Sequence, residues 1–331
     1  MQMDLPGAQL AGSRSAPALI QAGQDVSVHV PATSANLGPG FDSLGLALDL
    51  HDSIRVRTSG EEGLLVEVAG EGAGSVPLDG SHLVVRTLVS TLAAAGYGAA
   101  GLHLSAVNAI PHGRGLGSSA SAIVSGVLAA NALLPQEARL DAAALLDRCS
   151  ALEGHPDNVA PALAGGLAIS WETGGTFRSV QAPVHPGIVP VVAVPATELS
   201  TESARGLLPT AVPHRAAAAN SGRAALLVHA LANDPSLLPD GTKDELHQAF
   251  RAPAMLPSAE LMTALRAAGF AAVISGAGPT VLCLADGDAA AGEAEHLMAE
   301  HLRAAGTAEN WRVLRLGVQR DGARVEVHQR Y

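Results

Sequence analysis

The segment from Pro111 to Ala122 constrains this chain more than any other, because a glycine-rich loop there joins an apolar stretch to a helical pattern. The apolar stretch runs over 102–110, and apolar residues recur at helical spacing from Ala120 to Leu128. Glycine lets the backbone approach a ligand closely, and the free N–H groups at a helix start attract anions. The segment therefore predicts a phosphate-binding loop.

Two common nucleotide motifs are excluded by what this loop lacks. A Walker A loop needs Gly-Lys-Ser/Thr, and the only lysine of the chain is Lys243. The dinucleotide fingerprint G-x-G-x-x-G fails because its third glycine falls at Ser118. Glycine-rich turns without a ligand are also common, and a serine at a helix start can simply cap it. One cap needs one serine, so the pair Ser118 and Ser119 leaves a hydroxyl for a magnesium ion or a phosphate oxygen.

Composition limits the class of protein and its partners. The 331 residues suit two compact domains or one large one, and 48% of them are hydrophobic. A net charge of −11 argues against a nucleic-acid partner. No apolar run approaches the roughly 18 residues of a membrane span, and the first 24 residues lack the pattern of a secretory signal. We therefore expect a cytoplasmic protein with no membrane partner, a poorly ordered extension over 1–24, and buried free thiols at Cys149 and Cys283.

The order of the expected elements indicates an α+β fold. In the first half, strands are expected over 25–30, 44–50, 53–58, 64–68, from 102, and over 167–171, with helices over 82–95, from the glycine loop to about 134, and over 140–152. Proline and glycine cluster between Gly174 and Pro190, which predicts domains over 25–180 and 187–331. In the second half, strands are expected over 188–194, 273–275, 281–284, 311–316 and 324–328, with helices near Arg205 and over 216–231, 261–268 and 289–304. Strands and helices mix without a strict βαβ rhythm, which favours two layers per domain.

Four polar side chains crowd the six residues after an expected helix end: Glu153, His155, Asp157 and Asn158. The glycine and proline between them would suit a simple helix stop. A turn does not need all four polar residues, however, and a carboxylate near a serine-lined phosphate loop matches the ligands of Mg²⁺. Zinc is not expected, because the cluster has no cysteine pair and no His-x₃-His spacing.

Three further segments suggest recognition of a small, acidic molecule. The loop over 31–42 places Asn36 and Asp42 among turn-forming residues, although either could form only a local Asx-turn. Two short polar segments end on Arg205 and Arg251. A single arginine is usually a solvated surface charge, but a pair of them can bind a carboxylate in a two-pronged geometry that lysine cannot provide.

These segments, in this order, resemble the GHMP small-molecule kinases, and within that superfamily the branch that phosphorylates L-homoserine. The resemblance covers most of the chain, from about Val26 to Leu284. The loop Pro-x₃-Gly-Leu-Gly-Ser-Ser-Ala is typical of the superfamily, whereas the segments 31–47, 153–158 and 275–280 are more specific. The resemblance implies an ATP-dependent enzyme of threonine synthesis, with a ribosomal-S5-like N-terminal domain and a ferredoxin-like C-terminal domain. A homodimer is common in such a family.

The resemblance also implies roles for single residues. The ATP phosphates would lie in the loop, completed from the second domain by two glycines: Pro111, His112, Gly113, Arg114, Gly115, Leu116, Gly117, Ser118, Ser119, Ala120 and Ser121, with Gly276 and Gly278. Ser118 or Ser119 would hold Mg²⁺ together with Glu153. L-Homoserine would be bound by Asn36, Asp42, His155, Asp157, Arg205 and Arg251. Asp42 would face its ammonium group, and the two arginines its carboxylate.

Catalysis and two alternatives stay open at this point. Asp157 and Asn158 are the candidate catalytic residues, and we expect Asn158 to orient the acceptor hydroxyl while its proton leaves late, towards phosphate or water. One alternative is a related kinase that acts on mevalonate, shikimate or a sugar. The other is a nucleotide-binding regulatory protein that has lost catalysis. A dehydrogenase is weaker still, because the fingerprint fails.

Overall fold

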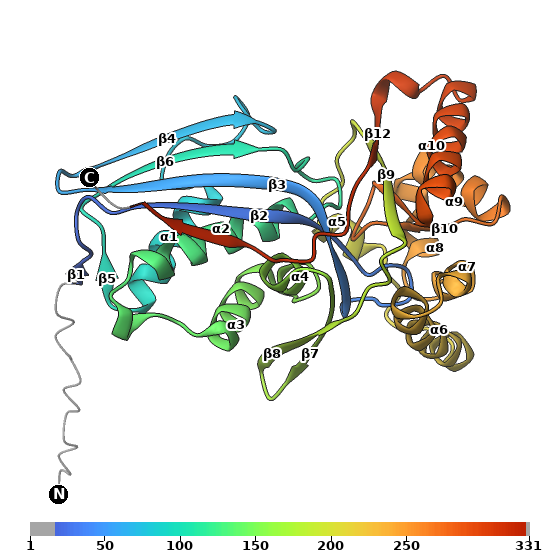
Figure 1. Ribbon diagram of the computed structural model, residues 1–331, viewed down its shortest axis with the longest axis horizontal. Helices are drawn as coiled ribbons and strands as arrows, with labels where there is room; N and C mark the ends of the chain where they lie inside the picture. The colour runs from blue at the N-terminus through green and yellow to red at the C-terminus, as the bar shows by residue number, and fades with distance from the viewer. Residues whose placement is uncertain (1–16, 329–331) are drawn as a thin grey trace, which may run out of the picture.

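The computed structural model describes residues 17–328, which form two units, each built on one β-sheet (Figure 1). The strands of the N-terminal sheet are β2 (Asp25–Ala35), β3 (Leu44–Ser59), β4 (Gly63–Gly70), β6 (Gly101–Asn108), β7 (Leu167–Thr173), β8 (Thr176–Ala182) and β13 (Arg324–Val327). Their order is β13-β2-β3-β6-β4, with β7 on β3 and β8 on β7. The β4–β6 pair is parallel, and the other pairs are antiparallel.

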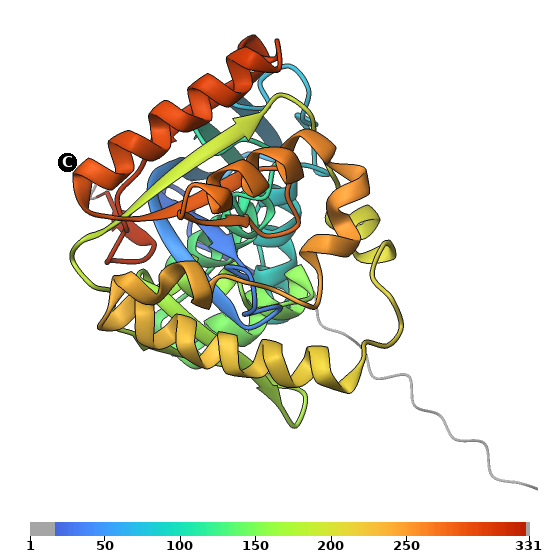
Figure 2. The ribbon, with the colours of Figure 1, turned by 90° about the vertical axis from the view of Figure 1, so that its right-hand side faces the viewer.

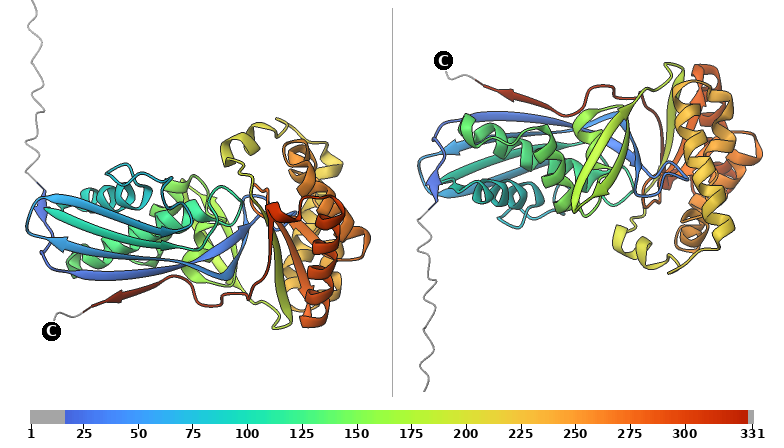
Figure 3. Two further views of the ribbon diagram at one scale, coloured as in Figure 1. Left: turned by 90° about the horizontal axis from the view of Figure 1, so that it is seen from above. Right: turned by 90° about the horizontal axis from the view of Figure 1, so that it is seen from below.

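Helices cover one face of this sheet, as Figures 1 and 3 show. They are α1 (Leu83–Ala94), α2 (Ser118–Leu133), α3 (Ala142–Glu153) and α4 (Val159–Ala164). Val26, Val28 and Val30 of β2 are fully buried in the core beneath them, because alternate residues of a strand point to the same face. The alternation that predicts a strand at 25–30 therefore also produces the core of the N-terminal unit.

The longest strand, β3, differs from the prediction of two strands over 44–50 and 53–58. It is continuous through Asp52, whose carboxylate accepts hydrogen bonds from the amides of Ala109 and Ile110 and from the Ser121 hydroxyl. These bonds offset the low strand preference of aspartate. The register between β2 and β3 shifts at Pro31, which is the kind of irregularity that bends a strand pair. Beyond this shift, both strands reach the C-terminal unit (Figure 1).

The C-terminal sheet has the order β10-β11-β9-β12, and all its pairs are antiparallel. Its elements are β9 (Ile188–Pro195), α5 (Thr201–Gly206), α6 (His214–Ala232), α7 (Leu238–Gly241), α8 (Gln248–Arg251), α9 (Leu256–Ala267), β10 (Ala271–Ile274), β11 (Val281–Asp286), α10 (Gly287–Ala304) and β12 (Trp311–Arg315). Figure 2 shows α10 and α6 along opposite edges of this unit. With α9 as the first crossover and α10 as the second, the unit has the β-α-β-β-α-β arrangement of a ferredoxin-like fold.

One hydrophobic core spans the junction of the two units. Leu44, Leu46 and Leu48 of β3 share a buried cluster with residues of the C-terminal sheet such as Val194 and Leu282. Close packing of this kind leaves few voids, so the packed side chains have little freedom to move. Loops that meet at the junction are therefore held by both units at once.

The predicted domain limits differ from the structure at both ends. The segment 187–331 does not form a unit by itself, because β13 returns to pair with β2. The prediction of a loose extension is wrong for residues 18–24, since β1 (Ala18–Leu19) pairs with β5 (Tyr97–Gly98) and Ile20 is buried. Residues 1–16 lie outside the described part. The short helix α4 and strand β8 were not predicted, and β8 occupies a segment that its glycines and prolines mark as a linker.

Two simpler expectations can be compared directly. Cys149 and Cys283 are buried free thiols, as predicted, and burial raises the pKa of each to about 12. Over residues 17–328, no helix has the length and apolar character needed to cross a membrane.

Candidate active site

Three loops that are far apart in the sequence meet at the junction of the two units. The amide of Thr33 donates to the carbonyl of Leu116 (3.1 Å), which joins β2 to the glycine-rich loop. The loop between β10 and β11 closes the arrangement, because the Ser275 hydroxyl donates to the carbonyl of Gly115 (2.6 Å) and the amide of Gly276 to that of Ala35 (3.0 Å). The predicted phosphate loop is thus supported by backbone from both units.

The glycine-rich loop ends at the start of α2. Gly117 adopts φ 74°, and a Cβ there would lie 2.1 Å from the Thr33 hydroxyl, so that no larger residue fits. Within the described residues, no side chain caps α2, although Ser118 and Ser119 follow Gly117 directly. The N–H groups of its first turn are therefore available to an anion.

A cavity of about 270 Å³ lies beside this helix start. Ser118 and Ser119 line it, together with His82 and Ser125. The Nδ1 atom of His82 and the Oγ atom of Ser125 are buried and have no hydrogen-bond partner within the described chain. Buried polar atoms without partners are costly, so the cavity suits a ligand that carries polar groups of its own.

Glu153, the last residue of α3, faces the same helix start. Its carboxylate accepts a hydrogen bond of 2.5 Å from the hydroxyl of Ser119, whereas Ser118 has no such bond. Burial raises the pKa of Glu153, and the Ser119 hydrogen bond only partly opposes this effect. A carboxylate and a hydroxyl at an anion-binding helix start are a donor set that Mg²⁺ accepts when phosphate oxygens and water complete its coordination. Within the described residues, no group of three or more His, Cys, Asp or Glu side chains gathers to hold a metal by itself.

The segment after α3 holds the other predicted polar residues. Nδ1 of His155 and a carboxylate oxygen of the buried Asp157 are 2.5 Å apart. Burial lowers the pKa of His155, but the hydrogen bond and charge of Asp157 outweigh burial and leave the pKa raised. The side-chain oxygen of Asn158 accepts a hydrogen bond from Thr33 (2.8 Å), which fixes Asn158 next to the phosphate loop.

Asp42 and Arg205 come together across the junction in a two-pronged ion pair, with distances of 2.7 and 3.0 Å. Asn36 accepts a hydrogen bond from the amide of Asp42 and donates one to the carbonyl of Gly276. The structure therefore brings these predicted substrate residues together. In it, however, Asp42 binds Arg205 and not a substrate group.

Arg251 is a deeply buried charge of the site, with an exposed fraction of 2%. Its guanidinium donates to the carbonyls of Ala204 (3.3 Å) and Gly276 (3.2 Å), and it lies over the ring of Phe41. Within residues 17–328, no carboxylate lies within ion-pairing distance of it. Burial lowers its pKa, as expected for a cation that lacks an anionic partner.

Several predicted ATP-binding residues have side chains that hold the phosphate loop in place. The Arg114 side chain donates to the carbonyls of His112, Pro195 and Ala196, and so ties the loop to the end of β9. Other predicted residues are buried: Leu116, Ala120 and Ser121. Gly278 packs against Met255, where a Cβ would clash. Packing and internal hydrogen bonds therefore occupy these side chains.

Sequence reasoning missed several polar residues that shape the site: Thr33, Asp52, His82, Ser125 and His247. Asp52 carried a signal, because a charged residue interrupts an otherwise apolar alternation. His82 and Ser125 carried none, since histidine and serine in helical segments are usually unremarkable.

Comparison with known proteins identifies the family of the chain. The family descriptions "GHMP kinases N terminal domain" and "GHMP kinases C terminal" match residues 82–166 and 223–304. A homoserine kinase of Streptomyces coelicolor is 52% identical over 91% of this chain and 94% of that protein. A second, from Streptomyces avermitilis, is 50% identical over 91% and 95%.

Solved structures extend the comparison to the fold. Homoserine kinase from Cytophaga hutchinsonii matches with a TM-score of 0.80 at 29% identity, covering 91% of this chain and 97% of that one. A mevalonate kinase of L. major, only 16% identical, shares the fold with a TM-score of 0.67 over 92% and 99%. The predicted two-domain α+β kinase fold is thereby confirmed, and the dehydrogenase alternative falls away. The chain belongs to the GHMP kinase family, as a member of its homoserine kinases.

Proposed function

We propose that this protein transfers the γ-phosphoryl group of ATP to the side-chain hydroxyl of L-homoserine, giving O-phospho-L-homoserine and ADP in threonine synthesis. The homoserine kinases to which it is similar support this acceptor. The cytoplasmic location stays a prediction from the sequence, and a homodimer stays an expectation from the family resemblance.

ATP is proposed to bind along the glycine-rich loop. The uncapped start of α2 offers N–H groups and a positive helix end to the phosphates. The adjoining cavity, with the unpartnered atoms of His82 and Ser125, suits the base or the ribose. The Gly276–Gly278 segment supports the loop from behind through Ser275 and Gly115.

Mg²⁺ is proposed to bind between the phosphates and the pair Glu153 and Ser119, whose donor atoms already lie 2.5 Å apart. When bound, the ion supplies positive charge that neutralises the phosphate oxygens. Glu153 is ionised more readily once a cation is beside it, because burial alone disfavours its charged form.

The observation that carries the choice of acceptor is the buried Arg251 guanidinium, which has no carboxylate partner in the described chain. A buried cation with no carboxylate at ion-pairing distance is unfavourable, and a carboxylate of the substrate reduces this cost. The Asp42–Arg205 pair beside it offers both signs of charge, which suits the ammonium and carboxylate of an amino acid. Neither mevalonate nor a sugar carries an ammonium group for Asp42.

Positioning and charge, rather than covalent chemistry, drive such a transfer. The acceptor oxygen attacks the γ-phosphorus in line while the bond to the β–γ bridging oxygen breaks, and the α2 amides stabilise the charge on the phosphoryl oxygens. Asn158 is proposed to orient the attacking hydroxyl, and its hydrogen bond with Thr33 beside the phosphate loop supports this role. The contact with His155 fixes the carboxylate of Asp157, the second candidate catalytic residue. The hydroxyl proton leaves late, towards a phosphate oxygen or water.

The test is release of ADP in the presence of Mg²⁺ with L-homoserine, mevalonate, shikimate or galactose as the acceptor. We expect turnover with L-homoserine alone, and a phosphate monoester of homoserine as the product. Turnover with another acceptor would keep the kinase reaction and discard the amino-acid pocket. Binding of ATP without turnover of any acceptor would favour the regulatory protein instead.

A further inference from the structure

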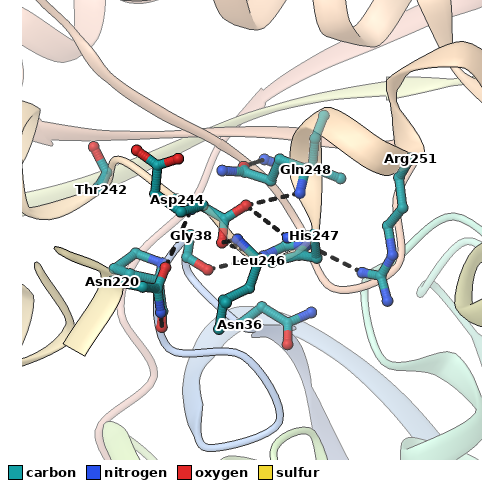
Figure 4. A network of polar contacts seen from close by, with 12 residues as sticks. Asn36, Gly38, Asn220, Thr242, Asp244, Leu246, His247, Gln248 and Arg251 are labelled. Atoms are coloured by element: carbon teal, nitrogen blue, oxygen red, sulfur yellow. Dashed lines mark hydrogen bonds and ion pairs between the residues drawn. The ribbon is translucent and has the colours of Figure 1, made fainter. Parts of the chain in front are cut away.

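Hydrogen bonds hold the one-turn helix α8, which carries Arg251, on several sides (Figure 4). The carboxylate of Asp244 accepts hydrogen bonds from the amides of Leu246 (2.8 Å), His247 (3.0 Å) and Gln248 (2.7 Å). The side-chain oxygen of Gln248 accepts a hydrogen bond from the amide of Ile274 (2.8 Å), just before the loop between β10 and β11. Such a short helix would fray alone, so these bonds determine where its residues point.

His247 uses both nitrogens of its fully buried ring. Nε2 lies 2.8 Å from the carbonyl oxygen of Gly38, and Nδ1 lies 3.2 Å from Nη1 of Arg251. A carbonyl can only accept and a guanidinium can only donate. The ring must therefore be neutral, with its proton on Nε2, to satisfy both neighbours. Burial lowers the pKa of His247, which favours this neutral form.

We propose that His247 is a positioning residue for the acceptor site, which holds the Arg251 guanidinium at a fixed distance from the 36–42 loop. This inference rests on the proposed role of Arg251 in binding the substrate carboxylate.

His247 is the side-chain acceptor of Arg251, and its 3.2 Å contact adds to those with two backbone carbonyls. The other acceptors of Arg251, the carbonyls of Ala204 and Gly276, are 3.3 and 3.2 Å away, and Nη2 has no partner within the described chain. An arginine has many rotamers, so a neutral acceptor on the residue that precedes α8 restricts it without taking up its charge. The charge is then left for a ligand at Nη2.

The loop side of this contact is equally fixed. Gly38 has φ +83°, and a Cβ there would lie 2.3 Å from the carbonyl oxygen of Thr242. The ring of His247 also packs on Phe41, with centroids 5.2 Å apart, and Phe41 lies beneath the guanidinium groups of Arg205 and Arg251. His247 thus connects the loop that carries Asp42 to the helix that carries Arg251.

Three substitutions separate the two bonds. His247→Gln keeps a donor for Gly38 and loses the acceptor for Arg251, His247→Asn keeps an acceptor near Nδ1, and His247→Phe keeps only the ring. We expect the Phe and Gln variants to raise the KM for L-homoserine about 10-fold or more, because small displacements of a binding group are costly, with the KM for ATP within about 2-fold. The Asn variant should show a smaller rise of about 3-fold, the loss of one neutral hydrogen bond.

The matched control is His51→Gln, on β3 outside the site, where we expect no change in either KM. If the Phe and Gln variants fold with unchanged KM for L-homoserine, or if both KM values rise in parallel, His247 does not position Arg251. If His247→Phe does not fold, the Gln and Asn variants decide.

A second readout needs no substrate, so that it separates this inference from the proposed function. In ¹⁵N-arginine-labelled protein, the Nη1–H protons of Arg251 should exchange with solvent more slowly in the wild type than in His247→Gln. Equal exchange would overturn the positioning role even if homoserine is the substrate. Slowed exchange in a wild type that does not phosphorylate homoserine would sink the proposed function alone.

Discussion

Asp42 and Arg205, 163 residues apart in the sequence, neutralise each other across the junction of the two units through two hydrogen bonds of 2.7 and 3.0 Å. Asp42 adopts φ 54°, and its amide is held by Asn36, so its carboxylate is presented by a strained and fixed loop. Arg205 comes from α5 of the other unit. A zwitterionic substrate can share both partners, since its ammonium satisfies the acid and its carboxylate the arginine.

Asp42→Asn should therefore weaken binding of the amino acid more than binding of ATP. We expect the KM for L-homoserine to rise about 10- to 100-fold, as for the loss of a charge-assisted hydrogen bond, with little change in the KM for ATP. Steady-state kinetics with each substrate varied in turn would measure this.

The double variant Asp42→Asn/Arg205→Met is the control for a purely structural role. If the pair only supports the fold, its coupling will appear in the melting temperature and not in the KM for L-homoserine. Coupling in the KM would tie both residues to the substrate.

Glu153→Gln tests the proposed metal site. The substitution keeps the hydrogen bond to Ser119 but removes the negative charge. We expect kcat to fall roughly 100-fold, the scale for loss of a preorganised electrostatic group, and more Mg²⁺ to be needed for half-maximal rate. Glu172→Gln, exposed on β7, is the matched control. A near-normal rate of Glu153→Gln at every Mg²⁺ concentration would remove Glu153 from the metal site.

How much of this site the sequence predicts depends on how local each signal is. The phosphate loop and α2 follow from adjacent glycines and a helical pattern. The return of β13 to β2 and the pairing of Asp42 with Arg205 do not, because both join segments far apart in the sequence. A strand end or an arginine carries no mark of its distant partner.

Asp52 and His247 show a second limit. In the sequence, Asp52 interrupts the apolar alternation of a strand. His247 attracts less attention than Arg251, which lies four residues later. Their roles depend on burial and on several acceptors or donors that converge in space. Residue type predicts that a buried polar group needs partners, but only the fold supplies them.

The His155–Asp157 contact makes part of the stability depend on pH. Because the pKa of His155 is raised in the folded state, its contribution is fully present below its ordinary value of 6.5 and is lost as the pH rises through the folded value. His155→Gln should therefore lose more stability at pH 6 than at pH 9. Denaturant unfolding should give a difference of about 1 to 2 kcal/mol, the size of a charge-assisted hydrogen bond. An equal loss at both values would mean that His155 is uncharged in the folded protein.

Arg114 provides the last prediction, because it lies in the phosphate loop without facing the proposed phosphates. Its guanidinium donates to the carbonyls of His112 (2.9 Å), Pro195 (2.9 Å) and Ala196 (2.7 Å). Three carbonyl oxygens around the planar guanidinium match its several N–H donors, and a lysine ammonium cannot bind all three at once. Arg114→Lys should therefore behave like Arg114→Met, with the KM for ATP raised about 10-fold in both, since the loop loses its tie to β9.

The outcome separates geometry from charge. If Arg114 acted by attracting phosphate, the lysine variant would keep most of the affinity for ATP and the methionine variant would lose it. The exposed partner Glu198, whose nearest oxygen is 3.5 Å from Nη1 of Arg114, gives the matched control. Glu198→Gln should leave the KM for ATP unchanged, because an exposed ion pair of this kind contributes little beside three carbonyl bonds. A near-normal KM for ATP in Arg114→Lys would thus refute the role of the Arg114 contacts with β9. An equal rise of the KM in Arg114→Lys and Arg114→Met would establish that the second unit holds the phosphate loop in place.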